Sequence, residues 1–590
     1  MEFQNKGKIV SGMFRETLLF MIMGILVSTL GTLIDGIVIG RLMGVEYMAA
    51  YGLVTPMFTI FSALGNLFSS GSQAFCAEYM GSGQVEKTNR NFSNALISVE
   101  IVAVVIMLLS FLFARPISVF LGASGESAYL LPYVKNYFLG LTIGLPFMVG
   151  VSALNPVMQL DGDRERAFLS TLVMMAVNVA GDLMNVYIFR GGMLGMALAT
   201  TFSYACAFAV LLLHFRKDDA MLRFRFARPD VKESRAIVAL GLPGAVSILC
   251  TTVRSYAMNR ILLSIADSTA VAASSARNTL ASFLTSISLG IGMTTLLLAG
   301  IVLGEEDRTN AGNLLKTALR SALAGMGAVA VLSFLAAPYL AYLFLGSGDM
   351  QAHALAVRSI RFYTFSMPLS AVVYVIMNFL QGTKSIKLAH TVCILDNFVY
   401  VVLLAAILGF AVGTDGVWLS FALAEAATCL TLLAAAACRK GRFPRDILDF
   451  AFLPENFGAK EGDVLEASIE NRGEVIRLSE EAEAFCRQHG ADERRTMLIA
   501  LTVEEMAGNI VEHGFSDGKR HSIELRLVKK DGDFIVSIRD DCRPFNPQKQ
   551  LELTNPDDPV SNIGIRMIFK MAKEFRYVNT MRVNHLIVRV

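Results

Sequence analysis

Three polar side chains interrupt long apolar stretches in the first half of the chain. Asp35 lies in TLGTLIDGIVIGRLMG, and Asn178 and Asp182 lie in MMAVNVAGDLMNVYIF. Four residues separate Asn178 from Asp182, so both side chains occupy one face of a helix. An ionised aspartate costs about 2.5–3.5 kcal/mol at the centre of a membrane helix, so such acids usually face a cavity and function there. The pattern predicts a site for a proton or small cation, with a structural hydrogen-bonded group as the alternative.

A second polar group lies further along the chain, again within apolar stretches. It consists of Arg254, Asp396 and Glu425. Because intramembrane acids pair with bases or line a cavity, two interpretations stay open. These residues form either a second polar site or a structural ion pair that holds helices together.

The third group is in the last 140 residues, where Glu505 and Asn509 are spaced to share one helical face. A carboxylate beside an amide can orient a water or hydroxyl group next to a metal-bound phosphate. Asp540 ends a strand pattern and can accept a hydrogen bond from an adenine amino group. Gly564 opens a helix pattern, where backbone N–H groups can cradle phosphate. Together these residues predict a nucleotide site.

The elements that must position these residues divide the chain near residue 450. Of residues 451–590, 44 of 140 are charged, against 58 of the 450 residues before them. Soluble proteins carry about 25% charged residues, so the first part is too apolar for a water-soluble fold and a purely soluble enzyme is excluded. A net charge of +2 also excludes a basic nucleic-acid binder. The eight cysteines form no CxxC pair, and hence no zinc or redox motif.

Apolar stretches of about 20 residues predict membrane-spanning helices. Lys and Arg concentrate on the side of the N-terminus, with seven between residues 216 and 235. This bias predicts a multi-pass plasma-membrane protein whose N- and C-termini are both cytoplasmic. We predict twelve helices, near 15–40, 49–79, 91–113, 130–157, 167–189, 192–215, 236–262, 271–303, 313–345, 358–381, 388–411 and 415–437.

The membrane part contains a repeat. GSQAFCAEYMGSGQVEKTN at 71–89 matches GMTTLLLAGIVLGEEDRTN at 292–310 at four positions, including Gly83 with Gly304 and Asn89 with Asn310. The offset spans six helices, so the two halves have the same topology, an architecture used by transporters with a site between the lobes. We therefore predict an N-lobe at 1–230 with helices 1–6 and a C-lobe at 231–450 with helices 7–12.

The end of the chain has a mixed pattern. We predict a linker at 451–474 and an α+β sandwich at 475–590. Its first part reads as two helices, and HSIELRLVKK and DFIVSIRDDC alternate as two strands around a turn at 530–533. SNIGIRMIFKMAKEFRY predicts a further helix, and NHLIVRV a last strand. The fold class is thus an all-α polytopic membrane protein with twelve helices in two six-helix lobes, plus this C-terminal domain.

Residues 10–440 resemble the multidrug and toxic compound extrusion (MATE) transporters. The resemblance rests on IDGIVIGRLMGVEYMAAYGLVTPM, on Gln159–Gly162, on Asn178–Asp182 and on GMLGMALATTFSY after it. It implies a central cavity between two lobes and export of substrate in exchange for protons or sodium ions. It further implies a cation site of Asp35, Asn178, Asp182 and Thr200. Leu183 stands where the family often has proline, which bears on how this helix bends.

Residues 475–590 resemble the histidine-kinase-like ATPase fold, in its anti-sigma-factor serine-kinase branch. The resemblance implies that Glu505 is a base, Asn509 a magnesium ligand, Asp540 an adenine ligand and Gly564 a neighbour of the phosphates. Two motifs depart from it, because Cys542 and Asn562 stand where the family has glycine. There is no Walker A motif, which excludes an ABC-type motor.

The leading interpretation is a proton- or sodium-coupled antiporter of small organic or drug-like molecules with an ATP- and Mg²⁺-binding regulatory domain. One alternative is a membrane signalling protein whose C-terminal domain is a serine kinase or captures a cytoplasmic regulatory protein. Another is a flippase for lipid-linked precursors. Whether the C-terminal domain has weak ATPase or kinase activity stays open. The expected partners are a small-molecule substrate and membrane lipid, with no nucleic acid.

Overall fold

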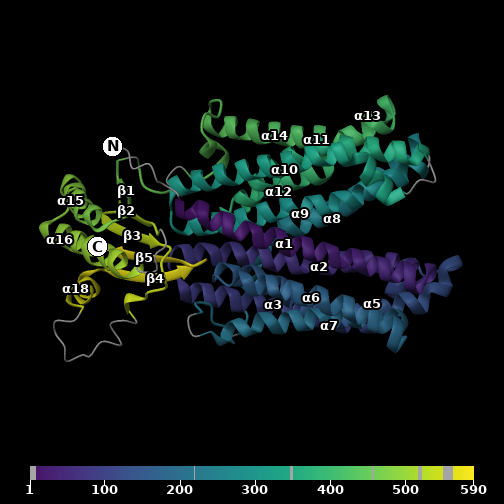
Figure 1. The fold of residues 1–590 in the computed structure, drawn as a ribbon, viewed down its shortest axis with the longest axis horizontal. Helices are drawn as coiled ribbons and strands as arrows, with labels where there is room; N and C mark the ends of the chain where they lie inside the picture. Colours follow the sequence, from purple (N-terminus) through teal and green to yellow (C-terminus); the bar gives the residue numbers. More distant parts are fainter. Residues whose placement is uncertain are drawn as a thin grey trace.

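A computed structural model describes residues 8–217, 220–226, 228–266, 268–345, 350–454, 457–460, 462–515, 521–548 and 562–590. Within these residues, twelve helical segments are long and apolar enough to cross a membrane, which confirms the predicted number. They lie roughly parallel in one bundle, and a smaller domain with a sheet is attached to one end of it (Figure 1). We call residues 464–590 the tail domain and the end of the bundle that it contacts the tail side.

The first six spanning segments make up the N-lobe. Its helices begin with α1, which enters from the tail side and ends in a π-helical turn. The bounds are α1 Lys8–Val38, α2 Val45–Gly81, α3 Val85–Leu112, the short α4 Ala114–Phe120, α5 Leu131–Leu160, α6 Arg164–Met184 and α7 Gly192–Leu212.

The second six spanning segments make up the C-lobe, in which one spanning segment is divided between two helices. The bounds are α8 Val231–Ile265, α9 Ser268–Gly304, α10 Arg308–Leu345, α11 Met350–Gly382, α12 Ile386–Ile394, α13 Tyr400–Val412 and α14 Thr414–Lys440.

Three π-helical turns lie next to the intramembrane acids. They occur at Ile39–Met43 after Asp35, at Asn185–Phe189 after Asp182, and at Leu395–Val399, which contains Asp396. Such turns are rare and often occur at functional sites. The helix that contains Leu183 therefore departs from α-helical geometry at Asn185, although Leu183 stands where the family often has proline.

The tail domain has a five-stranded antiparallel sheet in the order β1-β2-β3-β5-β4. The two predicted strands around residue 531 and the last strand are present as β2, β3 and β5. The bounds are β1 Val464–Ile469, β2 Ile523–Lys530, β3 Asp533–Asp540, β4 Glu574–Thr580, β5 Val583–Arg589, α15 Arg472–Gln488, α16 Glu493–Thr502 and α18 Ile563–Met571.

Two features differ from the sequence-based expectation. β1 lies within the segment 451–474 that we predict as a linker, and it pairs with β2 over its full length. The predicted helix over SNIGIRMIFKMAKEFRY ends at Met571, and β4 follows. β4 pairs with β5 as a local hairpin, with Thr580 opposite Val583, so our helix prediction extended too far into this strand.

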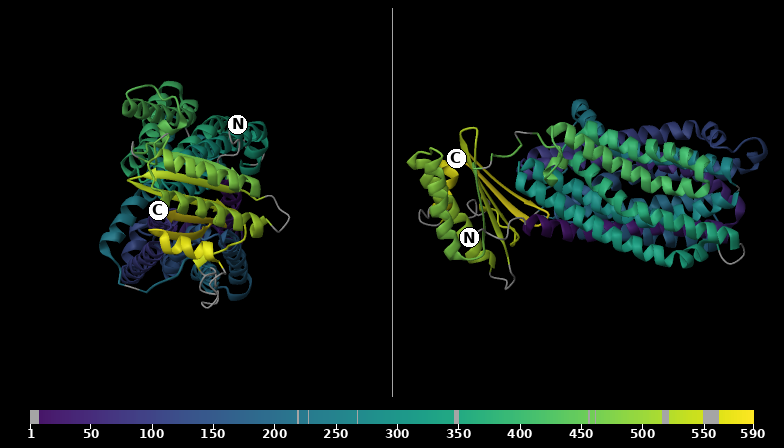
Figure 2. Two further views of the ribbon diagram at one scale, coloured as in Figure 1. Left: turned by 90° about the vertical axis from the view of Figure 1, so that its left-hand side faces the viewer. Right: turned by 90° about the horizontal axis from the view of Figure 1, so that it is seen from above.

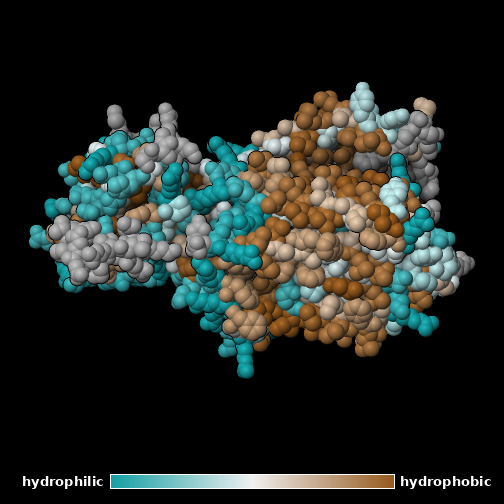
Figure 3. All heavy atoms as spheres, turned by 60° about the horizontal axis from the view of Figure 1, so that its bottom comes forward, coloured by the Kyte–Doolittle hydropathy of each residue, from teal (hydrophilic) through white to brown (hydrophobic). Residues whose placement is uncertain are grey.

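The sheet separates the helices of the tail domain from the membrane bundle (Figures 1 and 2). α15, α16 and α18 cover its outer face, and the apolar side chains between them form a separate core. Since side chains alternate along a strand, the intervening residues point to the bundle. Hydrophobic residues dominate the surface of the bundle, whereas hydrophilic residues dominate the tail domain (Figure 3).

Candidate functional site

The N-lobe brings Asp35, Asn178 and Asp182 together from α1 and α6. The amide nitrogen of Asn178 donates a hydrogen bond to Oδ1 of Asp35. Asp182 is fully buried and lies at hydrogen-bonding distance from the carboxyl group of Asp35. Neither carboxylate oxygen of Asp182 receives a bond from a conventional donor among the described residues. A proton shared between the two acids, or a bound cation, would satisfy these oxygens.

A small cavity of about 90 Å³ adjoins Asp35 and Asn178. Thr200 of α7 lines this cavity, although its hydroxyl group donates to the carbonyl of Met196 in its own helix, at 3.3 Å. Ser203, one turn later, lies 3.4 Å from Oδ1 of Asn178, and its hydroxyl group donates to the carbonyl of Thr200 at 2.7 Å. Our sequence analysis missed Ser203, and its i, i+3 spacing from Thr200 is the signal that could have identified it.

A larger cavity of about 370 Å³ lies on the tail side of the first one. Gln73 and Gln159 line it and are buried, and each has an amide atom without a hydrogen-bond partner among the described residues. Methionine and phenylalanine side chains form much of the remaining wall, which contains no charged residue. Such a cavity fits an organic molecule that offers both apolar surface and hydrogen-bonding groups.

The C-lobe brings Asp396 and Glu425 together. Their carboxyl groups lie at hydrogen-bonding distance, and the Thr428 hydroxyl donates to Asp396 at 3.1 Å. Arg254 acts on both acids electrostatically and lies 5.6 Å from the ring centre of Phe421. Arg277 of α9 is buried and lies closer to the same ring, at 4.1 Å.

The tail domain brings Glu505 against Gly564. A Cβ atom at Gly564 would overlap the carboxylate of Glu505, so any larger residue there would force the Glu505 side chain to move. Glu505 lies in a π-helical turn, Val503–Ala507, which packs against both α18 and β3. Asn509 directly precedes a second π-helical turn, Ile510–Gly514. These wider π-helical turns, and not a regular α-helix, therefore position both side chains.

Asp540 lies at the end of β3 and is buried. Its Oδ1 accepts hydrogen bonds from the Asn584 amide at 2.8 Å and from the backbone N–H of Cys542 at 3.0 Å. Burial raises the pKa of Asp540 above its usual value, and these two bonds offset part of that effect. Asn584 was not among our predicted site residues, because its pairing with Asp540 depends on the register of β3 and β5.

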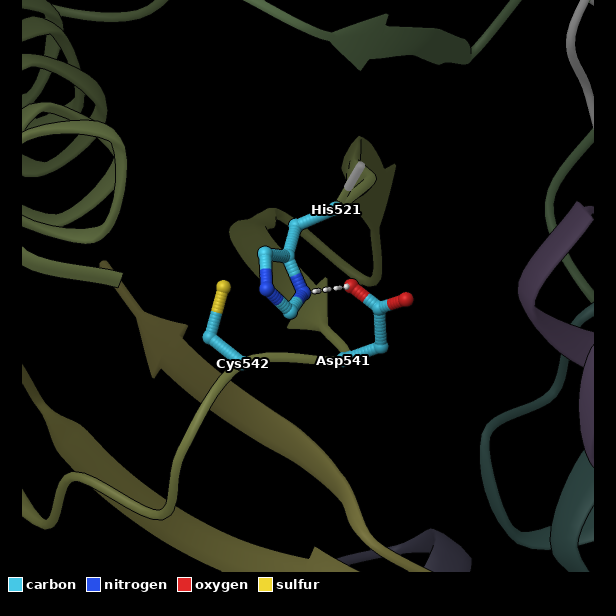
Figure 4. A group of neighbouring side chains, drawn as sticks. All are labelled: His521, Asp541 and Cys542. Atoms are coloured by element: carbon cyan, nitrogen blue, oxygen red, sulfur yellow. Dashed lines mark hydrogen bonds and ion pairs between the residues drawn. The ribbon is translucent and has the colours of Figure 1, made fainter. Parts of the chain in front are cut away.

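The two residues that replace family glycines behave differently. Asn562 adopts a left-handed conformation with φ of 56°, which asparagine tolerates. Cys542 is buried and close to Gly514. Cys542 also lies near His521 and Asp541 (Figure 4). Within this group, Oδ1 of Asp541 already accepts bonds from Nδ1 of His521 at 3.1 Å and from the backbone of Ser522 at 3.0 Å.

Comparisons with known families divide the chain in the same way. The MatE family matches residues 20–184 and 243–407, one match in each lobe. The histidine kinase-like ATPase domain family matches residues 470–590. Both sequence-based resemblances are therefore confirmed.

Known relatives match the membrane part. The multidrug export protein MepA of Staphylococcus aureus is 22% identical over 434 residues, which are 72% of this chain and 93% of MepA. MepA of Staphylococcus saprophyticus is 23% identical over 432 residues, with the same coverage. A solved outward-facing multidrug resistance MATE transporter aligns with a TM-score of 0.67 and 23% identity, covering 72% of this chain and 96% of that one.

Proposed function

Because the chain belongs to the MatE family, we propose that it is a cation-coupled antiporter that exports small organic molecules and carries a nucleotide-binding regulatory domain. The observation that carries the coupling proposal is the buried pair of Asp35 and Asp182 with Asn178 beside it. A proton or sodium ion would bind between the two acids and neutralise charge that is costly in the membrane. Binding would then bias the lobes toward one conformation.

The export substrate would occupy the larger cavity of the N-lobe. Its uncharged wall and its unpartnered glutamine amides favour an amphipathic organic molecule with hydrogen-bonding groups. Two relatives are described as multidrug export proteins, which supports the same substrate class. The Lys and Arg distribution supports a plasma-membrane location in which the tail side is cytoplasmic.

The tail domain would bind ATP with Mg²⁺ between its helices and the end of β3. Asn509 would hold the magnesium ion, Asp540 the adenine amino group, and the backbone around Gly564 the phosphates. Oδ1 of Asp540 is held by two hydrogen bonds, so the carboxylate is positioned before a ligand arrives. Bound Mg²⁺ would supply charge neutralisation for the phosphates. Glu505 would orient a water or hydroxyl group toward the terminal phosphate. A serine of a cytoplasmic regulatory protein would be a suitable acceptor of the phosphoryl group.

Transport into inside-out membrane vesicles tests the antiporter proposal. A fluorescent organic cation should accumulate when a pH or sodium gradient is imposed without ATP. Ionophores that collapse both gradients should stop accumulation even when ATP is present. ATP-driven accumulation after the collapse would contradict the proposal, because the membrane part would then depend on the tail domain for energy.

A further inference from the structure

The bundle-facing side of the tail sheet forms a buried ion-pair group with the C-lobe. Arg539 of β3 reaches the loop between α9 and α10, with its two terminal nitrogens 3.0 Å from Glu305 and 2.7 Å from Asp307. All three side chains are at least nine-tenths buried. Burial opposes ionisation of Asp307, but Arg526 and Arg539 outweigh it and hold its pKa below the usual value. At Glu305 burial outweighs Arg539 and raises the pKa to about 7, so Asp307 is the more strongly ionised partner of Arg539.

Arg526 of β2 strengthens the same contact. Its guanidinium group donates to the backbone carbonyls of Glu305 at 3.2 Å and Glu306 at 3.1 Å. Lys530 pairs with the Glu306 carboxylate. Three basic residues of the sheet therefore hold one acidic loop of the C-lobe.

The same sheet also contacts the N-lobe, where the backbone N–H of Ile9 at the start of α1 donates to Glu524 of β2 at 3.1 Å. Arg576 of β4 donates to the carbonyl of Ser82 at 2.6 Å, in the loop between α2 and α3. The backbone N–H of Met581 donates to the carbonyl of Leu160 at the end of α5, at 3.1 Å. Arg582 pairs with Glu165 of α6 at 2.9 Å. The tail domain thus bridges the two lobes.

The seam between the lobes is tightly closed beneath this bridge. α2 of the N-lobe and α9 of the C-lobe approach so closely that a Cβ atom at Gly81 would overlap the carbonyl of Ile301. One at Gly304 would overlap the carbonyl of Glu78. Further from the tail domain, Gly241 of α8 makes a similar approach to Leu67 of α2. Small residues at these positions allow the two backbones to touch.

We propose that the tail domain is an intramolecular clamp that holds the two lobes together at the tail side. Alternating access requires the lobes to rock against each other around the site between them. Separation at the tail side would pull the Glu305–Asp307 loop away from the Ser82 loop. One set of contacts with the sheet must then break. Because unpairing a buried charge is strongly unfavourable, the clamp favours the state closed on the tail side.

The strands also connect the clamp to the candidate nucleotide site. Arg539 and Asp540 are neighbours on β3 and point to opposite faces of the sheet, Arg539 to the C-lobe and Asp540 to the nucleotide site. β5 repeats this arrangement, because Asn584 bonds to Asp540 while the neighbouring His585 lies 3.5 Å from Glu305. This step rests on the proposed function of the tail domain, whereas the clamp itself does not require a bound nucleotide.

Labelling of a cysteine in the seam tests the clamp without substrate, ion gradient or ATP. Ser70 is buried on α2 beside Gly244 of α8, and Ser70→Cys is a nearly isosteric change. It would be introduced into the full chain with the eight native cysteines replaced. A membrane-impermeant maleimide is then applied from the tail side. Arg539→Ala removes the buried pairs with Glu305 and Asp307 and leaves the contacts of Arg526 and Lys530. This weakening of the C-lobe contact should raise the labelling rate about tenfold, a typical size for coupling between sites.

A second variant weakens the N-lobe contact instead, through Arg576→Ala with Arg582→Ala. It leaves no buried charge unpaired, because the side-chain partners, Glu574 and Glu165, are both accessible to solvent and the remaining partner is a backbone carbonyl. A clamp predicts faster labelling in either variant. Arg487→Ala, which removes an exposed pair with Glu483 on α15, is the matched control and should label at the unmodified rate. Unchanged labelling in both variants, with normal membrane insertion, would overturn the clamp. Failure of transport or nucleotide binding would leave this result unaffected.

Discussion

Asp182 is buried with no conventional donor bonding to its carboxylate oxygens among the described residues, and Asp35 is its acidic neighbour. We expect Asp35→Asn and Asp182→Asn each to abolish gradient-driven transport while the protein still inserts. An asparagine keeps the size of the side chain but cannot exchange a proton or neutralise a cation. The measurement is dye accumulation in vesicles under an imposed gradient.

Asp415→Asn is the matched control for these substitutions. Asp415 pairs with Arg358 at the start of α14, in the other lobe, so its removal should leave coupling intact. Transport at the unmodified rate in both Asp35→Asn and Asp182→Asn would exclude the acid pair as the coupling site.

Glu505 and Asn509 have different expected roles in the tail domain. Asn509→Ala removes the proposed magnesium ligand and should weaken binding of Mg²⁺–ATP. Glu505→Ala removes only the proposed base, so binding should persist and any slow hydrolysis should cease. Calorimetry on the full chain in detergent, combined with phosphate release, separates the two effects. Absence of binding at millimolar ATP in the unmodified chain would refute the nucleotide site.

At the scale of helices, the close approach of α2 and α9 depends on Gly81 and Gly304. Gly81→Ala or Gly304→Ala would force backbone atoms apart, and overpacking of this kind costs about 1–3 kcal/mol. Gly325→Ala on α10 is the control, because an added Cβ there meets no atom within 4 Å. Thermal unfolding in detergent should show a lower midpoint for the first two variants only. Equal midpoints for all three variants would mean that α2 and α9 do not pack in direct backbone contact at these glycines.

The sequence predicted the elements whose signals are local, and it missed those that depend on distant partners. Twelve apolar segments and the alternating β2 and β3 were predictable, because hydrophobic periodicity sets both. β1 was predicted as linker, because it becomes a strand only by pairing with β2, more than 50 residues later. β4, in contrast, forms a local hairpin with β5, and we misassigned it to the preceding helix. Similarly, the spacing of Asn178 and Asp182 was visible, whereas the contact of Arg539 with Glu305 joins residues over 230 positions apart.

At the scale of the whole molecule, the clamp and the nucleotide site share β3 and β5. We therefore expect Mg²⁺–ATP to change the labelling rate of the Ser70→Cys chain, by a factor within the usual range of about 5–150 for coupled sites. Arg539→Ala should greatly reduce this response, because it removes the buried pairs that link β3 directly to the C-lobe. Asn509→Ala should abolish it by preventing binding. An undiminished response in Arg539→Ala would show that the signal takes another route.

The two repeats differ in sequence at the acidic loop that contacts the tail domain. At the repeat offset of 221, Glu305, Glu306 and Asp307 correspond to Gln84, Val85 and Glu86. Asp307 also accepts a bond from the backbone N–H of Asn310 at the start of α10, and its counterpart Glu86 is acidic too, so the membrane part has its own use for this acid. Glu305 and Glu306, in contrast, replace uncharged residues and pair with the sheet. The two glutamates therefore offer a signature for surveying genomes. Among chains with this membrane part, those with a fused sheet domain should carry both glutamates together with a base at the position of Arg539, whereas those that lack the domain should not.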